Sequence, residues 1–424
     1  MKVLDLGRFA LRCSLAAAVV SGCASSTGIP GGAPLDMRVQ KQSGLNYTVL
    51  YSFGGSPTDG VNPQARLTKL NGTLYGTTVA GGSGCYASGG CGTVFAIAKS
   101  GAESILHSFA GGEDGAWPYA GVTAVNGVLY GATSGGASSS GSVFSVTTSG
   151  SETVLHNFEG TPDGSDPQAS LIAAGGALYG TTVFGGSQQN RGVVFQIAAS
   201  GAETVLHSFI GSRPGHRDGK YPEASLLNVN GTLYGTTYEG GDFDKGSVFK
   251  VTSSGSESVL HSFKGWATDG SYPRAGLVYV NGMLYGTTSG GGIGRCNGCG
   301  NHEHYGTVFA ITPSGKERLI YKFKGYPNDG AVPDAQLLYD NGTFYGTTES
   351  GGANCAISHG CGTIFSITTS GSERMLYSFL PSDGAAPVSG LIDISGTLYG
   401  TTPNGGTYDE GTVYSFQTSF TRKP

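Results

Sequence analysis

Charged residues are scarce in this chain: they make up only 12% of its 424 residues, about half of the usual share of roughly 25%. Lysine and arginine together number 24, against 29 aspartates and glutamates, so the chain lacks the basic surface that nucleic-acid binding requires. The net charge of −5 is small, and 38% of the residues are apolar, which argues against a disordered chain.

Long apolar runs are also missing. A helix that crosses a bilayer needs about 20 consecutive apolar residues, and no stretch of this chain reaches that length. No amphipathic helix period appears after residue 46, and 75 glycines disfavour long helices. These glycines do not recur at every third position, which excludes a collagen-like chain. With 10% aromatic residues to build a core, the sequence predicts an all-β protein whose glycines mark turns.

The first residues have the composition of a signal peptide. Residues 1–22 carry three basic residues and then a short apolar stretch, residues 15–20. The segment ends in Val20-Ser21-Gly22-Cys23, which resembles the lipobox of bacterial lipoproteins. This resemblance implies cleavage before Cys23, lipidation (palmitate among the acyl chains) of Cys23 and, from Ala24, sorting to the outer membrane of a Gram-negative cell. Residues 23–46 then form a flexible linker; an ordinary signal peptide with an incidental cysteine is the alternative.

The rest of the chain repeats one unit seven times. The motif Leu-Tyr-Gly-Thr-Thr is followed by Gly-Gly, a variable loop, a Gly-Thr-Val-Phe strand and a Ser-Gly turn. A Val-Leu-His-Ser-Phe strand, Asp-Gly and Pro-x-Ala-x-Leu complete the unit. Asn-Gly pairs such as Asn71-Gly72 suit tight hairpin turns. Copies of the first motif begin at Leu74, Leu129, Leu178, Leu233, Leu284, Phe344 and Leu398.

Four strands per unit predict a seven-bladed β-propeller, with strand a at Pro-x-Ala-x-Leu and strand d outermost. Residues 47–53 form a strand d without a, b or c before it, and residues 387–417 supply a, b and c without a d after them. We therefore expect one blade to be split between the two ends, which closes a ring over residues 47–417 and leaves 418–424 as a tail. A β-solenoid is the weaker alternative.

This consensus, with its Ser-Gly-x-Glu-x-Val-Leu segment, resembles the tandem GloVer (Gloeobacter–Verrucomicrobia) repeat of bacterial surface and secreted proteins. The resemblance covers about residues 47–417. It implies a propeller-type fold and varied modes of anchoring, and it carries no activity over to this chain.

The variable b–c and d–a loops share one face of such a ring, where binding residues are expected. Exposed aromatic and basic residues in these loops are candidates for a contact surface, although several could simply pack between blades. They are Trp117, Tyr119, Arg217, Tyr221, Trp266, Tyr272, Arg274, Arg295 and Tyr326.

Six cysteines remain after the signal peptide and Cys23 are set aside, and they fall in three close pairs. Outside the cytoplasm, such pairs are most simply disulfides. Cys296 and Cys299 have an alternative, because His302 and His304 follow and zinc prefers thiolate and imidazole ligands. The pairs are Cys85/Cys91, Cys296/Cys299 and Cys355/Cys361.

Three recurring residue types require interpretation. The outer-strand His107, His156, His207 and His261 are replaced by tyrosine in the other blades, and a glutamate follows each Ser-Gly turn, so we assign both to structural roles. The seven Asp-Gly pairs predict turns. Calcium is the alternative, although one aspartate per loop is few oxygens for an ion that takes six to eight.

No Gly-x-Ser-x-Gly elbow, phosphate loop or His-Glu-x-x-His motif is present, so catalysis has no clear signature. We expect a monomeric, envelope-anchored binding or interaction scaffold for a glycan or a protein. The alternative is a carbohydrate-active enzyme, which needs paired carboxylates. The acidic residues to examine first are Asp242, Asp244, Glu303 and Glu349.

Overall fold

A computed structural model describes residues 46–418 except 86–88, 137–139, 188, 213–216, 294–304, 354 and 356–359. These residues lie in one compact unit that spans residues 39–424. Their regular structure is β-strand, apart from the short 3-10 turns η2 (Gly112–Asp114) and η3 (Trp266–Thr268). Within this part of the chain, no helix is long and apolar enough to cross a membrane.

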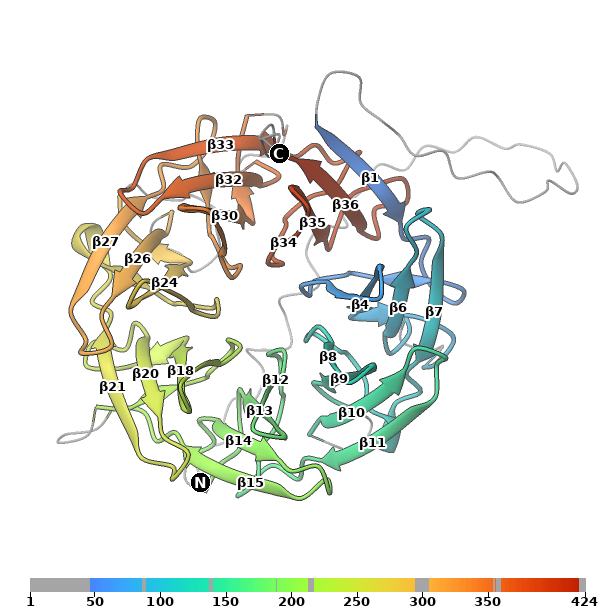
Figure 1. Cartoon of the computed structure of the whole chain (residues 1–424), viewed down its shortest axis with the longest axis horizontal. Coiled ribbons are helices and arrows are strands. Elements are labelled where there is room, and N and C mark those ends of the chain that lie inside the picture. The colour runs from blue at the N-terminus through green and yellow to red at the C-terminus, as the bar shows by residue number, and fades with distance from the viewer. Residues whose placement is uncertain are drawn as a thin grey trace, which may run out of the picture. The chain divides into compact units, whose positions relative to one another are not determined.

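Seven antiparallel four-stranded sheets form blades arranged in a ring (Figure 1), and their inner ends line a central channel. In each blade the chain moves outward, from the innermost strand a to the outermost strand d. In the order a to d, the strands are β3 (Thr68–Leu70), β4 (Thr73–Thr78), β6 (Thr93–Ile97) and β7 (Glu103–Ser108) in blade 1; β8 (Thr123–Val125), β9 (Val128–Thr133), β10 (Ser142–Thr147) and β11 (Glu152–Asn157) in blade 2; β12 (Ile172–Ala174), β13 (Ala177–Thr182), β14 (Val193–Ile197) and β15 (Glu203–Ser208) in blade 3; β17 (Leu227–Val229), β18 (Thr232–Thr237), β20 (Ser247–Val251) and β21 (Glu257–Ser262) in blade 4; β23 (Val278–Val280), β24 (Met283–Thr288), β26 (Thr307–Ile311) and β27 (Glu317–Lys322) in blade 5; β29 (Leu338–Asp340), β30 (Thr343–Thr348), β32 (Thr363–Thr368) and β33 (Glu373–Ser378) in blade 6; and β34 (Ile392–Ile394), β35 (Thr397–Thr402), β36 (Thr412–Gln417) and β1 (Tyr47–Ser52) in blade 7.

The split blade closes the ring as the sequence predicts. Strand β1 pairs antiparallel with β36, with Tyr47 opposite Phe416 and Ser52 opposite Thr412. The all-β, seven-bladed propeller is therefore confirmed. Two-residue strands form small two-stranded sheets before strand a and after strand b; they are β2 (Gly60–Val61) with β5 (Ala80–Gly81), β16 (Gly219–Lys220) with β19 (Glu239–Gly240), β22 (Gly270–Ser271) with β25 (Gly290–Gly291), and β28 (Gly330–Ala331) with β31 (Ser350–Gly351).

The predicted position of strand a in the sequence is wrong. Pro-x-Ala-x-Leu is irregular backbone, and the innermost strand is only the three residues after it, such as β3 after Leu67. Proline has no N–H for a strand ladder, and the residue before it adopts a positive φ, as at Asn62. The irregular stretch and the first residues of strand a face the channel.

Aromatic side chains pack the blades against one another. The phenylalanine that follows strand d meets the phenylalanine of strand c in the next blade, edge to face, as Phe53 meets Phe95 at 5.1 Å between ring centroids. The pair Phe209 and Phe249 repeats this contact at 5.1 Å. The glycine of Leu-Tyr-Gly-Thr-Thr makes room for this ring, since a Cβ on Gly76 would lie 2.5 Å from Phe95.

The first threonine of the same motif ties each blade to the next. Thr236 in β18 donates its hydroxyl hydrogen to the backbone carbonyl of Ala275, at 3.2 Å, in blade 5. Thr77, Thr181, Thr287, Thr347 and Thr401 make the equivalent bond. Blade 2 has Ala132 at this position and lacks the hydroxyl. The repeated motif is thus explained by packing between blades.

Candidate functional site

The central channel is lined by the Pro-x-Ala-x-Leu stretches of all seven blades. They enclose a cavity of about 720 Å³. The residue between proline and alanine occupies one level of this channel in every blade. In blade order, these residues are Gln64, Tyr119, Gln168, Glu223, Arg274, Asp334 and Val388. Their flanking residues hardly change from blade to blade, so the channel lining is where the otherwise similar repeats differ.

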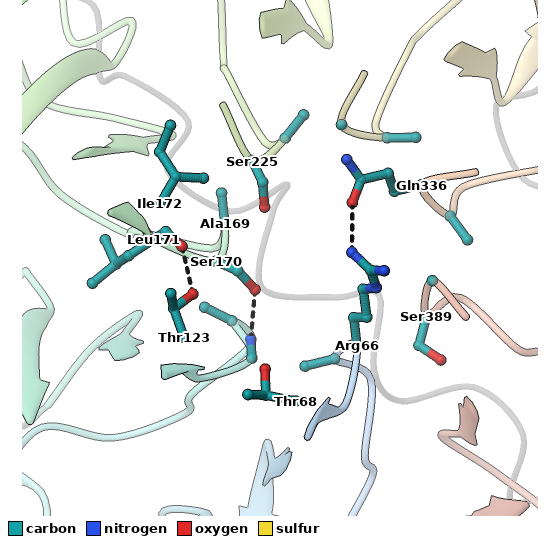
Figure 2. A pocket seen from close by; sticks show the side chains of 18 of the residues that line it. Arg66, Thr68, Thr123, Ala169, Ser170, Leu171, Ile172, Ser225, Gln336 and Ser389 are labelled. Carbon is teal, nitrogen blue, oxygen red and sulfur yellow. Dashed lines mark hydrogen bonds between the residues drawn. The ribbon is translucent and has the colours of Figure 1, made fainter. Parts of the chain in front are cut away.

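A second set of lining residues follows two positions later. Three of the seven are glycines, at 121, 276 and 390, and the longest are Arg66 and Gln336. Arg66 extends from blade 1 and donates from Nη1 to Gln336 Oε1 of blade 6 at 3.3 Å, as Figure 2 shows. The Cδ of Arg66 would lie 3.3 Å from a Cβ on Gly390, so glycine in blade 7 leaves room for this bridge.

Blades 4 to 6 place three charged side chains side by side in the first set. Arg274 Nε lies 3.4 Å from Glu223 Oε2, and its Nη1 lies 4.0 Å from Asp334 Oδ2. The Asp334 side chain is only 8% exposed. Its Oδ1 atom is buried and has no hydrogen-bond partner among the described residues. A buried acceptor in this state is unsatisfied, so a donor that reached it would offset the cost of its burial.

Two glutamates in this region have raised pKa values. Burial raises the pKa of Glu223 to about 7, against the opposing effect of Arg274. Burial, together with the charge of Asp334, also raises the pKa of Glu349 to about 7. At neutral pH these groups can therefore serve as donors or acceptors of a proton.

Tyrosines adjoin the charged group. The guanidinium of Arg274 lies 4.4 Å from the ring centroid of Tyr238, and the ring of Tyr272 lies 5.1 Å from that of Tyr238. Lys245 donates to the Tyr272 hydroxyl at 2.7 Å. Cation–π contacts hold these rings in place. Arg274 with its neighbours Glu223, Asp334, Glu349, Tyr238 and Tyr272 is called the channel cluster below.

The residue before each channel proline has a left-handed backbone. The φ values are 58° at Trp117, 60° at Tyr221, 58° at Tyr272 and 58° at Val332. Bulky and β-branched residues rarely adopt this conformation. Each of these N–H groups donates to a carbonyl of the preceding blade, as Tyr272 does to Lys245, which holds the strained geometry.

Three of the predicted contact residues therefore occupy one repeat position. Trp117 is 43% exposed and lies against Gly135, whereas Tyr221 and Tyr272 are partly buried by their neighbours. Trp266 is 69% exposed. The acidic candidates at Asp242 and Asp244 form ion pairs with Arg217 and Lys220 respectively. Of the three acidic candidates that the structure describes, Asp242, Asp244 and Glu349, only Glu349 joins the channel cluster.

Several predicted site residues lie outside the described residues. They are the lipidation site Cys23, and Arg295, Cys296, Cys299, His302, Glu303 and His304.

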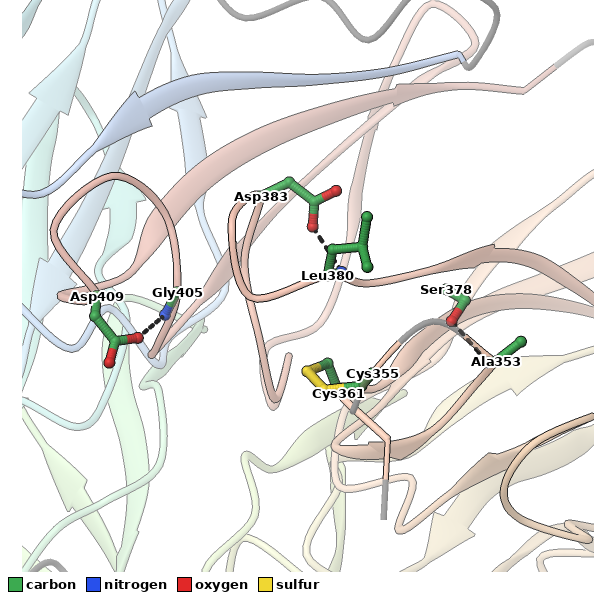
Figure 3. The surroundings of a disulfide bond; sticks show 8 residues. All are labelled: Ala353, Cys355, Cys361, Ser378, Leu380, Asp383, Gly405 and Asp409. Carbon is green, nitrogen blue, oxygen red and sulfur yellow. Dashed lines mark hydrogen bonds between the residues drawn. A yellow bond between two sulfur atoms is a disulfide. The ribbon is translucent and has the colours of Figure 1, made fainter. Parts of the chain in front are cut away.

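The other two cysteine pairs form disulfides, which supports that prediction. Cys85 is bonded to Cys91, with 5.5 Å between Cα atoms. Cys355 is bonded to Cys361, with 5.4 Å between Cα atoms (Figure 3). Both lie in b–c loops on the variable face, so they fix loop conformation.

The sequence matches the profile of the Gloeobacter/Verrucomicrobia repeat over residues 84–300 and 294–423. The chain belongs to this family. No protein with a curated description matches it. The predicted resemblance is thus confirmed.

Several solved structures resemble this member of the Gloeobacter/Verrucomicrobia repeat family. Hydrazine synthase from Kuenenia stuttgartiensis superposes with a TM-score of 0.53 at 14% identity, covering 87% of this chain and 99% of that chain. The designed protein Ika8 gives 0.46 at 13% identity, with coverage of 87% and 99%. A putative gluconolactonase gives 0.43 at 11% identity, with coverage of 89% and 93%.

Across the Gloeobacter/Verrucomicrobia repeats of this chain, the Asp-Gly aspartate accepts a hydrogen bond from the outer strand. Histidine provides this contact in four blades, for example His107 Nε2 to Asp114 Oδ1 at 3.0 Å. Tyrosine provides it elsewhere, as Tyr321 does to Asp329 at 2.7 Å. The aspartate also accepts backbone N–H groups, so the predicted turn role is observed.

Sequence reasoning did not identify the channel cluster as a unit, and it did not single out Glu223, Tyr238 or Asp334. A signal was present: Pro-x-Ala is nearly constant, while its middle residue changes in charge and size from blade to blade. Variation within a constant motif marks a position that packing does not determine.

Proposed function

We propose that this propeller is a binding module that holds a polar, hydroxyl-rich ligand, such as a glycan, at the channel cluster. The observation that carries the proposal is the buried, unpartnered Asp334 Oδ1 beside Arg274, at a level of the channel where the repeats differ. Carboxylates accept hydrogen bonds from hydroxyl groups, and guanidinium donates them. The ring of Tyr238 packs against the Arg274 guanidinium and holds it in position for such a ligand.

The proposed location is the cell envelope, through a lipid on Cys23. The basic and apolar segment before Cys23 supports this, and so does the lipobox-like sequence. A lipid anchor would keep the module at the membrane surface, because each buried CH₂ contributes about 0.8 kcal/mol. Metabolic labelling with a palmitate analogue tests it, since a Cys23→Ser variant should lose the label.

A carbohydrate-active enzyme is the second candidate, on one specific observation. Glu349 and Glu223 have pKa values raised to about 7, and the carboxylate Asp334 lies beside them. A protonated carboxyl next to an ionised one is the arrangement that glycoside hydrolysis uses. A glycan that is bound but not cleaved would support the binding module, and a glycan that is bound and cleaved would support the enzyme.

A glycan array followed by a turnover assay on the bound glycans tests both. We expect the protein to retain at least one glycan class, and Asp334→Asn to weaken retention. Asp242→Asn is the matched control, because Asp242 pairs with the exposed Arg217 on the loop face. Retention that is equal in all three proteins would contradict the channel cluster as the site.

A further inference from the structure

Each junction between neighbouring blades brings together residues from three repeat positions. The outer-strand histidine and the Asp-Gly aspartate come from one blade, and the glutamate after the Ser-Gly turn comes from the next. In three junctions one ligand atom of each residue lies within 4.8 Å of the other two. These sets are His107/Asp114/Glu152, His207/Asp218/Glu257 and His261/Asp269/Glu317.

The glutamate in these sets has an oxygen that nothing satisfies. Oε1 of Glu152, Glu257 and Glu317 is buried and has no hydrogen-bond partner among the described residues, which is also true of Glu103, Glu203 and Glu373; the nearby imidazole and second carboxylate are what mark these three junctions. Two carboxylates and one imidazole meet here, and the described residues supply no lysine or arginine ion pair to balance them. A buried, unpaired carboxylate oxygen beside a second carboxylate calls for a cation or a proton.

We propose that these three junctions bind divalent transition-metal ions, with Zn²⁺ as the first candidate, each held by one imidazole nitrogen and two carboxylate oxygens. The Nε2–Asp oxygen distances are 3.0, 3.4 and 3.3 Å in the three sets. Tetrahedral zinc with bonds of roughly 2.0–2.1 Å separates its ligand atoms by about 3.4 Å, so the two atoms already lie near the required spacing.

Binding requires only small changes. The proton on Nε2 is released, or moves to Nδ1, so that the nitrogen lone pair faces the ion. Glutamate moves toward the pair, and water takes the fourth position. In the first set the second oxygen of Asp114 accepts the Ala110 N–H, which fixes the carboxylate from behind. The side chains of His107 and Asp114 are 20% and 23% exposed, so an ion can enter from solvent.

The ligand set selects the class of ion. One nitrogen and two oxygens suit zinc and similar ions, whereas calcium takes six to eight oxygens. Because the ligands come from two blades, each ion ties neighbouring outer strands together. The ions would thus stabilise the ring rather than form the ligand site in the channel.

One junction of the same chain has tyrosine in place of the histidine and shows which substitution makes a suitable control. At the junction of blades 5 and 6, Tyr321 replaces histidine: its hydroxyl donates to Asp329 Oδ2 at 2.7 Å, and the hydroxyl oxygen lies 3.2 Å from Glu373 Oε2. Tyrosine therefore preserves the junction without offering an imidazole. Replacing histidine by tyrosine removes the proposed metal ligand with a residue that the same repeat position already accepts.

The experiment is calorimetric titration of Zn²⁺ into purified protein stripped with EDTA, using wild type and a His107→Tyr/His207→Tyr/His261→Tyr variant. We expect the number of zinc ions bound to fall by three in the variant. We also expect zinc to raise the melting temperature of wild type by several degrees more than that of the variant. Zinc that binds elsewhere, for example at the Cys296 segment, is common to both proteins and cancels.

A second variant covers the case in which the first does not fold. Glu152→Gln/Glu257→Gln/Glu317→Gln removes one carboxylate from each site, preserves side-chain size and should reduce zinc binding in the same way. Equal stoichiometry and equal melting shifts in wild type and the folded variants would overturn the proposal, and the buried oxygens would then hold protons.

Discussion

Arg66 and Gln336 are 270 residues apart in the chain and meet across the channel, where Arg66 Nη1 donates to Gln336 Oε1 at 3.3 Å. Arg66 also donates from Nε to the Leu391 carbonyl at 3.1 Å. One side chain of blade 1 therefore contacts blades 6 and 7, across the junction where the ring closes.

We expect Arg66→Ala to lower the free energy of unfolding by about 1 kcal/mol, because hydrogen bonds in contact with water contribute modestly. Urea denaturation measures this change. Lys69→Ala is the control, since Lys69 is exposed in the same blade. Equal midpoints for the two variants would show that the bridge contributes nothing to closure.

Asp218, as an Asp-Gly aspartate, should contribute more to stability than Asp242 in the loop that follows strand b. Its carboxylate accepts the N–H groups of Ile210 and Gly219, both at 2.7 Å. Asp218→Ala leaves both donors without a partner, so we expect a loss of about 3 kcal/mol in urea denaturation. Asp242→Ala should cost under about 1 kcal/mol, because its partner Arg217 is an exposed residue. The reverse order would contradict the turn role.

Stability should fall as the pH rises toward neutrality. Burial, aided by nearby Asp59, raises the pKa of Glu103 to about 7, and burial with Asp329 does the same for Glu373. A pKa that is higher in the folded than in the unfolded state stabilises the fold only while the group is protonated. This contribution is complete below about pH 4.5 and is lost as the pH rises through about 7.

Urea denaturation at pH 5 and pH 8 in EDTA checks the sign. Wild type should lose more stability between these two pH values than Glu103→Gln/Glu373→Gln, whose amides do not titrate. An equal loss in both proteins would show that these two carboxyls keep ordinary pKa values.

The blades and their closure could be predicted because their signals are local and repeated. Turn pairs such as Asn71-Gly72 and the orphan strand at residues 47–53 are visible without any three-dimensional information. The residues that form strand a could not be predicted, because an apolar Pro-x-Ala-x-Leu stretch looks like a strand until the positive φ at Asn62 is known.

The candidate site was only partly predictable, because its members are brought together by the ring. Arg274 and Glu349 were singled out from sequence, but for different reasons and in different roles. Their electrostatic interaction depends on the packing of neighbouring blades, because Arg274 lies in the Pro-x-Ala stretch of blade 5 and Glu349 follows strand b of blade 6. Similarly, the outer-strand His107 and the glutamate Glu152 belong to different repeats, and only blade packing brings them to one junction.

The two disulfides should stabilise loops and leave the ring intact. Each closes a loop with a sequence separation of 6 residues, so the chain-entropy contribution is about 2 kcal/mol. We expect Cys85→Ser/Cys91→Ser to keep the β-sheet circular dichroism spectrum and to lower the unfolding free energy by about that amount. A variant that loses its β-sheet signal would show that the fold itself depends on the bridge.

The central claim is that blades 4 to 6 bind a ligand through the channel cluster. Its most direct measurement is the dissociation constant of a glycan retained on the array, determined by titration calorimetry for wild type, Arg274→Gln and Arg217→Gln. Arg274 lies between Glu223 and Asp334, whereas Arg217 lies on the loop face. We predict at least a tenfold weaker affinity for Arg274→Gln, which corresponds to about 1.4 kcal/mol, and no change for Arg217→Gln. Unchanged affinity in Arg274→Gln, or a loss only in Arg217→Gln, would contradict the account.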